Sequence, residues 1–427
     1  MEHELKDIRY QSRTYRKLQT LMNRVNVETL KEEHRKQISG KAAGVDGVTK
    51  EEYDAELDKN VNGLIARMKK FSYKPLPARR THIPKATGGE RPLGIPSYED
   101  KLVQAVMADV LSDVYEERFT NYSYGFRPGR GAHDAVKVLN DAIGRGKVGY
   151  VLEADIKGFF DNVSHDKLME FLGNDIEDKN FLRYIKRFLI AGIMEGAEFK
   201  ESDKGTPQGG PMSPVLANVY LHYVLDLWYE KWLKGAIGGE SHYVRYCDDF
   251  VFLFQYKQDA EKAMTWLIER LAKFGLEVAG DKTRILPFGR FNGTKDSFDF
   301  LGFTFFNART REGKYRPGIR TSEKKLKAKR AAAKEWLRTR LTKPIAETMK
   351  ILNKALQGHY NYYGISGNYV MIGKFANYVK LTCYRMLNRR DQKGKMTVEA
   401  FNRIWAYYIK PPRLKVDIWN GWKPKVV

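Results

Sequence analysis

Two adjacent aspartates, Asp248 and Asp249, interrupt an otherwise apolar and aromatic stretch of the chain, RYCDDFVFLF at residues 245–254. The β-branched and aromatic residues on either side favour two strands closing on a tight turn at Cys247-Asp248-Asp249. Buried carboxylates are costly unless a metal ion, a base or water compensates them. Because side chains alternate along a strand, we expect one aspartate to face a site and the other to be secondary. A solvated hairpin tip is the simpler alternative.

A second acidic position follows a buried strand earlier in the chain. The stretch VGYVLEA at residues 148–154 predicts a strand that ends at Asp155. Two-metal phosphoryl transfer needs carboxylates that converge from separate strands, which Asp155 and the 248–249 turn could supply. The alternative for Asp155 is a helix N-cap in the turn that follows.

The net charge of +23 is concentrated at one end of the chain. Residues 311–427 contain 28 Lys and Arg against 7 Asp and Glu, whereas residues 1–310 contain 47 against 45. A basic C-terminal third with interleaved aromatic residues is typical of a nucleic-acid partner. A basic surface that serves only solubility is the alternative.

Size and composition fit a soluble globular protein with two or three domains, since 42% of the 427 residues are hydrophobic and 30% charged. No apolar run approaches a membrane span, and the polar start MEHELKDIRY has no signal-peptide core. We therefore expect an intracellular protein with no membrane partner. Cys247 and Cys383 are too few for a zinc site built on CxxC pairs, and no structural disulfide is expected.

Periodicity predicts helices at both flanks with short strands between them. Helical patterns cover residues 10–38, 51–70, 98–118 and 258–275, and 205–222 reads as a loop that feeds a helix. Residues 71–96 are rich in Pro and Gly with short extended pieces. A basic helix capped by Ser322 is expected over 322–341. These elements indicate an α+β body followed by a mostly helical basic domain from about residue 320.

Eight ordered blocks resemble the motifs of the bacterial group II intron reverse transcriptase/maturase family. They begin with GVDGVT (44–49), IPKATGGERPLGIPSYEDKLVQ (83–104), YSYGFRPGRGAHDAV (122–136) and EADIKGFFDNVSH (153–165). They continue with GTPQGGPMSPVLANVYL (205–221), RYCDDFVFL (245–253), GLEVAGDKT (275–283) and FDFLGF (298–303). Cys247 stands where the commonest hairpin of this family has alanine.

The resemblance implies an α+β right-hand polymerase. Fingers and an antiparallel palm sheet flanked by helices would occupy residues 1–320, with an N-terminal extension over about 1–70. A mostly helical thumb, called domain X in this family, and a short basic tail would occupy 321–427. No additional cysteines or acidic cluster suggest an endonuclease or RNase H domain, so the endonuclease-less type is expected.

The resemblance also assigns roles to single positions. Asp155, Asp248 and Asp249 would be catalytic, and two Mg²⁺ ions would be held at Asp155, Ile156 and Asp248. Contacts with the deoxynucleoside triphosphate (dNTP) substrate are expected from a set of six residues: Lys85, Arg91, Ile156, Phe160, Gln208 and Lys282. Lys85 and Arg91 would clamp the triphosphate, and Phe160 would exclude a 2′-hydroxyl while Phe159 belongs to the core.

Nucleic acid would be held by two elements, FDFLGF and the basic helix. FDFLGF is expected as one strand, with Gly302 allowing close contact. The helix residues in question are Lys324, Lys325, Lys327, Lys329 and Arg330. Solvated loop cations, core aromatic residues and an ordinary turn are the alternatives for these positions when each block is taken alone.

The function implied is an RNA-dependent DNA polymerase of the bacterial cytoplasm that also assists splicing and retromobility as a maturase. Its partners would be group II intron RNA, an RNA template with a DNA primer, and target DNA; either a monomer or a dimer is compatible with the sequence. Two alternatives stay open: a polymerase-inactive, RNA-binding maturase, and a related reverse transcriptase of phage defence or CRISPR adaptation.

Overall fold

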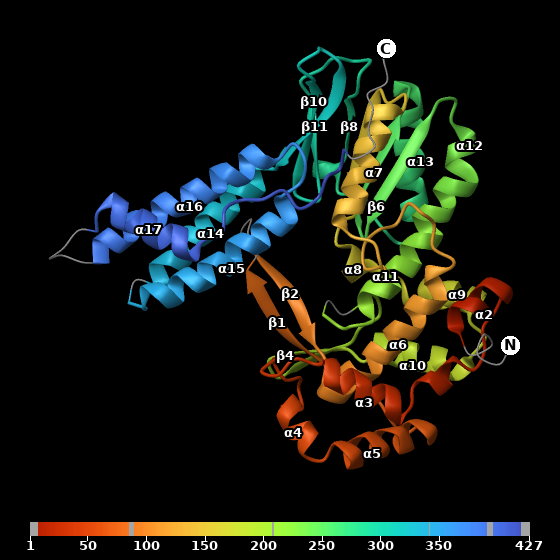
Figure 1. Cartoon of the computed structure of the whole chain (residues 1–427). Coiled ribbons are helices and arrows are strands. Elements are labelled where there is room, and N and C mark those ends of the chain that lie inside the picture. Colours follow the sequence, from red (N-terminus) through yellow and green to blue (C-terminus); the bar gives the residue numbers. More distant parts are fainter. Residues whose placement is uncertain (1–6, 85–88, 207–208, 341, 391–395, 420–427) are drawn as a thin grey trace.

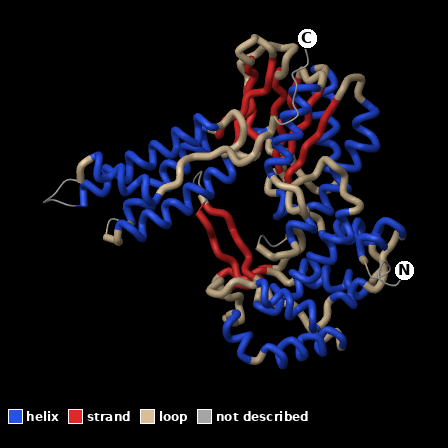
Figure 2. Tube along the Cα trace, in the orientation of Figure 1, coloured by secondary structure: helices blue, strands red, loops and turns tan. Residues whose placement is uncertain are grey.

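The computed structural model describes residues 7–84, 89–206, 209–340, 342–390 and 396–419. The strands form three sheets with helices around them. Four C-terminal helices project to one side (Figures 1 and 2). Within these residues, no helix has the length and apolar character needed to cross a membrane.

Short helices form the N-terminal region. Those before the first strand are α2 (Ile8–Thr14), the 3₁₀ turn η1 (Leu21–Arg24), α3 (Val27–Lys36), α4 (Lys50–Ala55) and α5 (Leu57–Lys69). The first turns of α3 and α4 are fixed by capping boxes, in which Asn26 pairs with Thr29 and Thr49 with Glu52. Both α2 and α3 pack against the long buried helix α6 (Tyr98–Glu116).

The first sheet projects as a ribbon between these helices and the C-terminal helices (Figure 1). It joins β1 (Ala78–Pro84) and β2 (Glu90–Ile95) as an antiparallel pair, and adds β4 (Ile193–Glu195) parallel to β1 and then β5 (Glu198–Lys200). The extended pieces expected over 71–96 are these first two strands.

The second sheet is antiparallel, in the order β6-β7-β3-β8. Its strands are β3 (Tyr150–Asp155), β6 (Ser241–Tyr246), β7 (Asp249–Phe254) and β8 (Arg284–Pro287). Asp155 is the last residue of β3, as predicted. The turn between β6 and β7 consists of Cys247 and Asp248 alone, because Asp249 already pairs with Tyr246. The prediction of a turn that includes Asp249 was therefore wrong by one residue.

Alternate residues of this sheet belong to two different cores. Leu152 of β3 and Phe252 of β7 enter the core that contains α6, whereas Val151 and Leu253 enter the core that contains the C-terminal helices. Since both faces are covered, the strands read as continuous apolar runs.

Helices surround the second sheet. They are α7 (Ala132–Arg145), α8 (Phe159–Asn162), α9 (His165–Asp175), α10 (Lys179–Leu189), α11 (Ser213–Leu221) and α13 (Lys257–Ala272). From α11 the chain continues through the π-helical turns η2 (His222–Asp226) and η3 (Tyr229–Leu233) into α12 (Lys234–Ala236). A 3₁₀ turn, η4 (Gly280–Lys282), precedes β8.

The third sheet, β11-β10-β9, connects the second sheet to the C-terminal helices. It contains β9 (Ser297–Phe300), β10 (Phe303–Arg309) and β11 (Tyr315–Thr321). FDFLGF was predicted as one strand, but Leu301 and Gly302 both have positive φ and form a turn between β9 and β10. The prediction missed the glycine turn signal inside an apolar run.

The four projecting helices are α14 (Glu323–Thr339), α15 (Ile345–Tyr363), α16 (Tyr369–Arg390) and α17 (Val398–Tyr408). The Ser322 hydroxyl accepts a hydrogen bond from the Lys325 backbone N–H, which confirms the predicted N-cap of α14. The apolar residues of α15 and α16 join the core that includes α7, β9–β11 and one face of the second sheet.

A fully buried ion pair lies beneath the β6–β7 turn. The Arg245 guanidinium donates from Nε and Nη2 to the two carboxylate oxygens of Asp226, at 2.8 and 2.5 Å. Its Nη1 donates to the Cys247 carbonyl at 3.0 Å and to the Asn218 side-chain oxygen at 2.9 Å. This bidentate pair therefore ties the helical segment after α11 to the turn that carries Asp248.

We predict that Asp226→Asn lowers the free energy of unfolding by roughly 3–5 kcal/mol, because it leaves the Arg245 charge buried without a counter-charge. Urea unfolding at pH 7 measures this. Asp58→Asn, which affects an exposed pair with Lys31, is the control and should change stability by less than about 0.5 kcal/mol.

The same pair predicts an acid transition. Burial alone would raise the pKa of Asp226, but the charge of Arg245 lowers it to about 2. Since an unfolded Asp has a pKa near 3.9, the pair stabilises the protein fully above about pH 4 and loses its contribution as the pH falls through 2. Stability that fell equally with acid in Asp226→Asn and the parent protein would contradict this.

Candidate active site

Three carboxylates that are distant in the sequence meet at one end of the second sheet. The antiparallel register of β3 and β7 places Asp155 opposite Asp249, and Asp248 occupies the adjoining turn. All three line a cavity of about 1310 Å³. The expectation that only one of the two neighbouring aspartates faces the site was wrong, because Asp248 lies in the bend and escapes the alternation of the strand.

The pKa values of Asp248 and Asp249 are both raised above the usual value for an aspartate. Withdrawal from bulk water raises the pKa of Asp248, and the charge of Asp155 adds to the effect. The same withdrawal, followed by the charges of Asp248 and Asp155, raises the pKa of Asp249 to about 7, although this side chain still opens onto the cavity. Lys282 compensates part of the charge, since its Nζ lies 2.6 Å from an Asp155 carboxylate oxygen. The arrangement favours a bound cation.

One side of the cavity is formed by the first sheet and the segment after β3. Arg91 of β2, Phe160 of α8 and Ile156 line it. Phe160 is half-buried with its ring in contact with Phe159, which is 2% exposed and belongs to the core as predicted. The Ile156 side chain is buried, so only its backbone can face a ligand. Lys85 and Gln208 lie outside the described residues.

The loop at 209–210 presses against the first sheet. Gly209 has a φ of +121°, and a Cβ there would lie 2.5 Å from the Gly94 carbonyl oxygen of β2. Only glycine combines this backbone conformation with such a close approach. The loop therefore closes the cavity between the first sheet and α11.

The opposite side of the cavity is one face of α14. Lys325, Ala328, Lys329 and Ala332 follow a helical i, i+3, i+4, i+7 pattern and line it together with Gly302. Arg330 points elsewhere, with its guanidinium over the Tyr378 ring of α16 at 5.2 Å. Lys324 and Lys327 are exposed and do not line the cavity. Of the five basic residues predicted to bind nucleic acid, Lys325 and Lys329 therefore line the cavity that contains the carboxylates.

Comparison with known proteins identifies the fold that carries these carboxylates. Residues 83–305 match the family model for reverse transcriptase (RNA-dependent DNA polymerase). The chain belongs to the reverse transcriptase family. It is 33% identical to protein YkfC of Escherichia coli over 68% of this chain and 83% of YkfC. It is 27% identical to the group II intron-encoded protein LtrA of Lactococcus lactis over 84% of this chain and 72% of LtrA.

Among solved structures, telomerase from Candida albicans matches 84% of this chain and 67% of its own at 14% identity, with a TM-score of 0.43. The α+β reverse transcriptase fold and the group II intron reverse transcriptase/maturase family, both expected from the motifs, are confirmed. The protein is an RNA-directed DNA polymerase by membership of this family.

The donor atoms of the reverse transcriptase site suit a hard divalent cation. Carboxylate and backbone carbonyl oxygens are what Mg²⁺ prefers, and it is commonly held by one or two carboxylates plus substrate phosphates. Within the described ranges, no three His, Cys, Asp or Glu side chains are arranged to hold a metal ion by themselves.

Sequence reasoning missed the residues that support the reverse transcriptase site. Asn218 lies in the segment predicted as a loop that feeds a helix, Asp226 lies beyond that segment, and no role was predicted for Arg245. A charged residue next to a predicted buried strand was the available signal at Arg245, since buried charges are almost always paired. Its partner could not be identified from local spacing.

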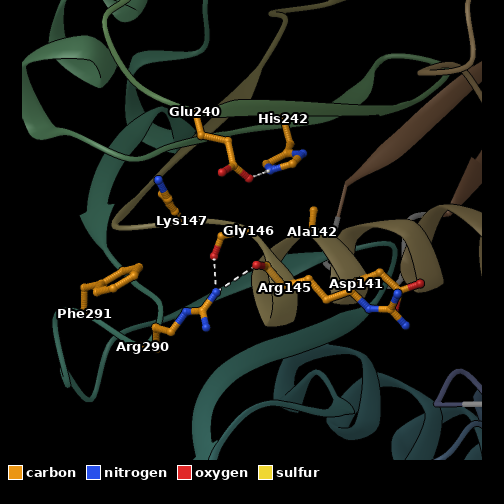
Figure 3. Close-up of a pocket in the computed structure, with 9 residues that line it drawn as sticks. All are labelled: Asp141, Ala142, Arg145, Gly146, Lys147, Glu240, His242, Arg290 and Phe291. Carbon is orange, nitrogen blue, oxygen red and sulfur yellow. Dashed lines mark hydrogen bonds and ion pairs between the residues drawn. The ribbon is translucent and has the colours of Figure 1, made fainter. Parts of the chain in front are cut away.

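A second cavity of about 500 Å³ lies on another part of the reverse transcriptase (Figure 3). Arg290 Nη2 donates there to the carbonyl oxygens of Arg145 and Gly146, each at 2.8 Å. The His242 Nε2 and the Glu240 carboxylate form a hydrogen bond. Phe291 projects beside them. Among the described residues, none lines both this cavity and the carboxylate cavity.

Proposed function

We propose that Asp155, Asp248 and Asp249 form the polymerase centre of this reverse transcriptase and that two Mg²⁺ ions bind there. The position of Asp155 opposite Asp249 on paired strands, beside Asp248, is the observation that supports this assignment. When bound, such ions activate the attacking hydroxyl and stabilise the leaving phosphate oxygens. The protein's own part is to hold carboxylate oxygens, and the Ile156 carbonyl, on a rigid sheet end.

The incoming dNTP binds on the side of Arg91 and Phe160 in this proposal. A guanidinium can grip triphosphate oxygens bidentately, and Lys85 and Lys282 add point charges. Phe160 packs below the sugar and leaves no space for a 2′-hydroxyl. Gln208 contacts the nucleotide and template, next to Gly209, which approaches the first sheet.

The product duplex leaves on the side of α14. Lys325 and Lys329 meet the phosphates, while Ala328, Ala332 and Gly302 let the nucleic-acid backbone approach closely. We assign polymerisation to residues 1–320 and the thumb, or domain X, to 321–427. Group II intron RNA and target DNA are the further partners, and the basic C-terminal third supports this role.

We predict that Asp248→Asn reduces Mg²⁺-dependent primer extension on an RNA template by roughly 10²- to 10³-fold or more, because it removes a metal ligand. Binding of the RNA template, measured by filter retention, should persist. Asp166→Asn, at an exposed position in α9, is the control. Full-length DNA synthesis by Asp248→Asn at the parent rate would refute the assignment of the site.

Phe160→Ala should admit ribonucleotides. The ratio of kcat/KM for dGTP over GTP is expected to fall by about 10- to 100-fold, since the change removes a steric wall rather than a hydrogen bond. Phe199→Ala, at an exposed position in β5, should leave the ratio unchanged. Unaltered sugar discrimination in Phe160→Ala would remove its role as a gate.

The double variant Lys325→Gln/Lys329→Gln should weaken binding of primer–template and reduce the slope of log Kd against log salt concentration by up to about 2, one for each lost phosphate contact. Lys324→Gln/Lys327→Gln removes the same charge from the same helix, away from the cavity. Equal slopes for the two double variants would mean that α14 acts only through its total charge.

A further inference from the structure

Left-handed backbone is concentrated around the carboxylate cavity. Among the described residues, five that are not glycine have positive φ, and three of these line this one cavity: Phe126 at 54°, Cys247 at 57° and Leu301 at 50°. Two-residue turns between paired strands account for Cys247 and Leu301. Phe126 lies in the loop between α6 and α7, where no hairpin requires this conformation.

The residues on both sides of Phe126 are held firmly. The Gly125 carbonyl accepts a hydrogen bond from the Asn218 side-chain amide at 2.7 Å, and a Cβ on Gly125 would lie 2.6 Å from the Cys247 backbone nitrogen. Arg127 is 5% exposed and donates to both carboxylate oxygens of Glu116 and to two backbone carbonyls. The loop is therefore fixed against the β6–β7 turn.

The Phe126 side chain itself is 55% exposed. Its ring contact is with Tyr246, whose centroid lies 6.3 Å away, immediately before the turn that carries Asp248. A left-handed conformation of a bulky residue costs free energy, and an exposed ring recovers little of it in the free protein. The fold thus maintains an apolar ring in the cavity at the expense of stability, a pattern typical of binding surfaces.

The ring lies on the opposite side of the carboxylates from Phe160. Across the second sheet, Phe160 follows β3, the carboxylates lie on β3 and β7, and Phe126 contacts β6. Tyr362 of α15 lies on the same side. Its backbone carbonyl accepts a hydrogen bond from His133, which lies just after the Phe126 loop, and its hydroxyl donates to the Leu301 carbonyl. If the dNTP binds near Phe160, a primer that reaches the carboxylates from the side opposite the dNTP passes Phe126.

We propose that Phe126 is a binding residue for the primer strand, with its ring packed against the last nucleotides of the primer. This rests on the proposed polymerase centre. Apolar contact of an aromatic ring with sugars and bases is independent of sequence, which suits a polymerase. The buried network of Asp226, Arg245 and Asn218 positions the ring, since the same side chains hold Gly125 and Cys247.

The decisive variant is Phe126→Gly, because glycine adopts the observed φ without strain. If the ring serves the fold, this change lowers the melting temperature. If it serves the primer, the melting temperature is unchanged or higher, while the Kd for a DNA primer annealed to an RNA template, without dNTP, rises about 5- to 30-fold. Phe126→Tyr keeps an aromatic ring and should have the same primer–template Kd as the parent protein.

Two controls make the result specific. Phe291→Ala removes a ring that is 59% exposed and lies at the separate cavity of Figure 3, so it should leave the Kd unchanged where Phe126→Ala raises it. Binding of the single-stranded RNA template alone should be equal in Phe126→Gly and the parent protein, because the primer is absent.

Three outcomes overturn the proposal: a lowered melting temperature with an unchanged primer–template Kd, an equal loss for the single-stranded template, or a raised KM for dNTP with an unchanged Kd. Failure of the polymerase centre is distinguished from these, since Asp248→Asn would then still extend the primer at the parent rate. Loss of extension in Asp248→Asn, together with an unchanged Kd in Phe126→Gly, removes only the role of the ring.

Discussion

Burial of both faces of the second sheet is the constraint from which the arrangement of the site follows. With one face packed against the core around α6 and the other against the core of the C-terminal helices, charged side chains within the strands would be withdrawn from water on either side. Only the strand ends and the connecting turn reach the cavity. Antiparallel pairing of β3 with β7 then brings the end of one strand to the start of the other, so that Asp155 and Asp249 face the same opening.

Arg245 is a charged residue of β6 that is fully buried next to the turn. Its bidentate pair with Asp226 satisfies the charge, and its third contact holds the Cys247 carbonyl. A buried ion pair is weak evidence for net stability, but its directional bonds fix geometry better than apolar packing does. Here they hold a strained turn and the neighbouring Phe126 loop in one register relative to α11.

The sequence predicted what depends on local pattern. Asp155 at a strand end, the paired aspartates at a hairpin, the cap at Ser322 and the helices at both flanks all depend on periodicity or on a few neighbouring residues. The motifs added the family. What could not be predicted depends on contacts between distant segments: Asp226 with Arg245, Asn218 with Gly125, and the choice of which lysines of α14 face the cavity. The turn at Leu301 was missed because an apolar run concealed it, although Gly302 was a visible signal.

The C-terminal helices share their core with α7, β9–β11 and one face of the second sheet. A chimera that exchanged these helices between relatives would therefore have to match Val151, Val251 and Leu253 on the acceptor sheet as well as the exchanged segment. The C-terminal helices therefore do not form an independent module, because part of their core is supplied by the sheet that carries the carboxylates.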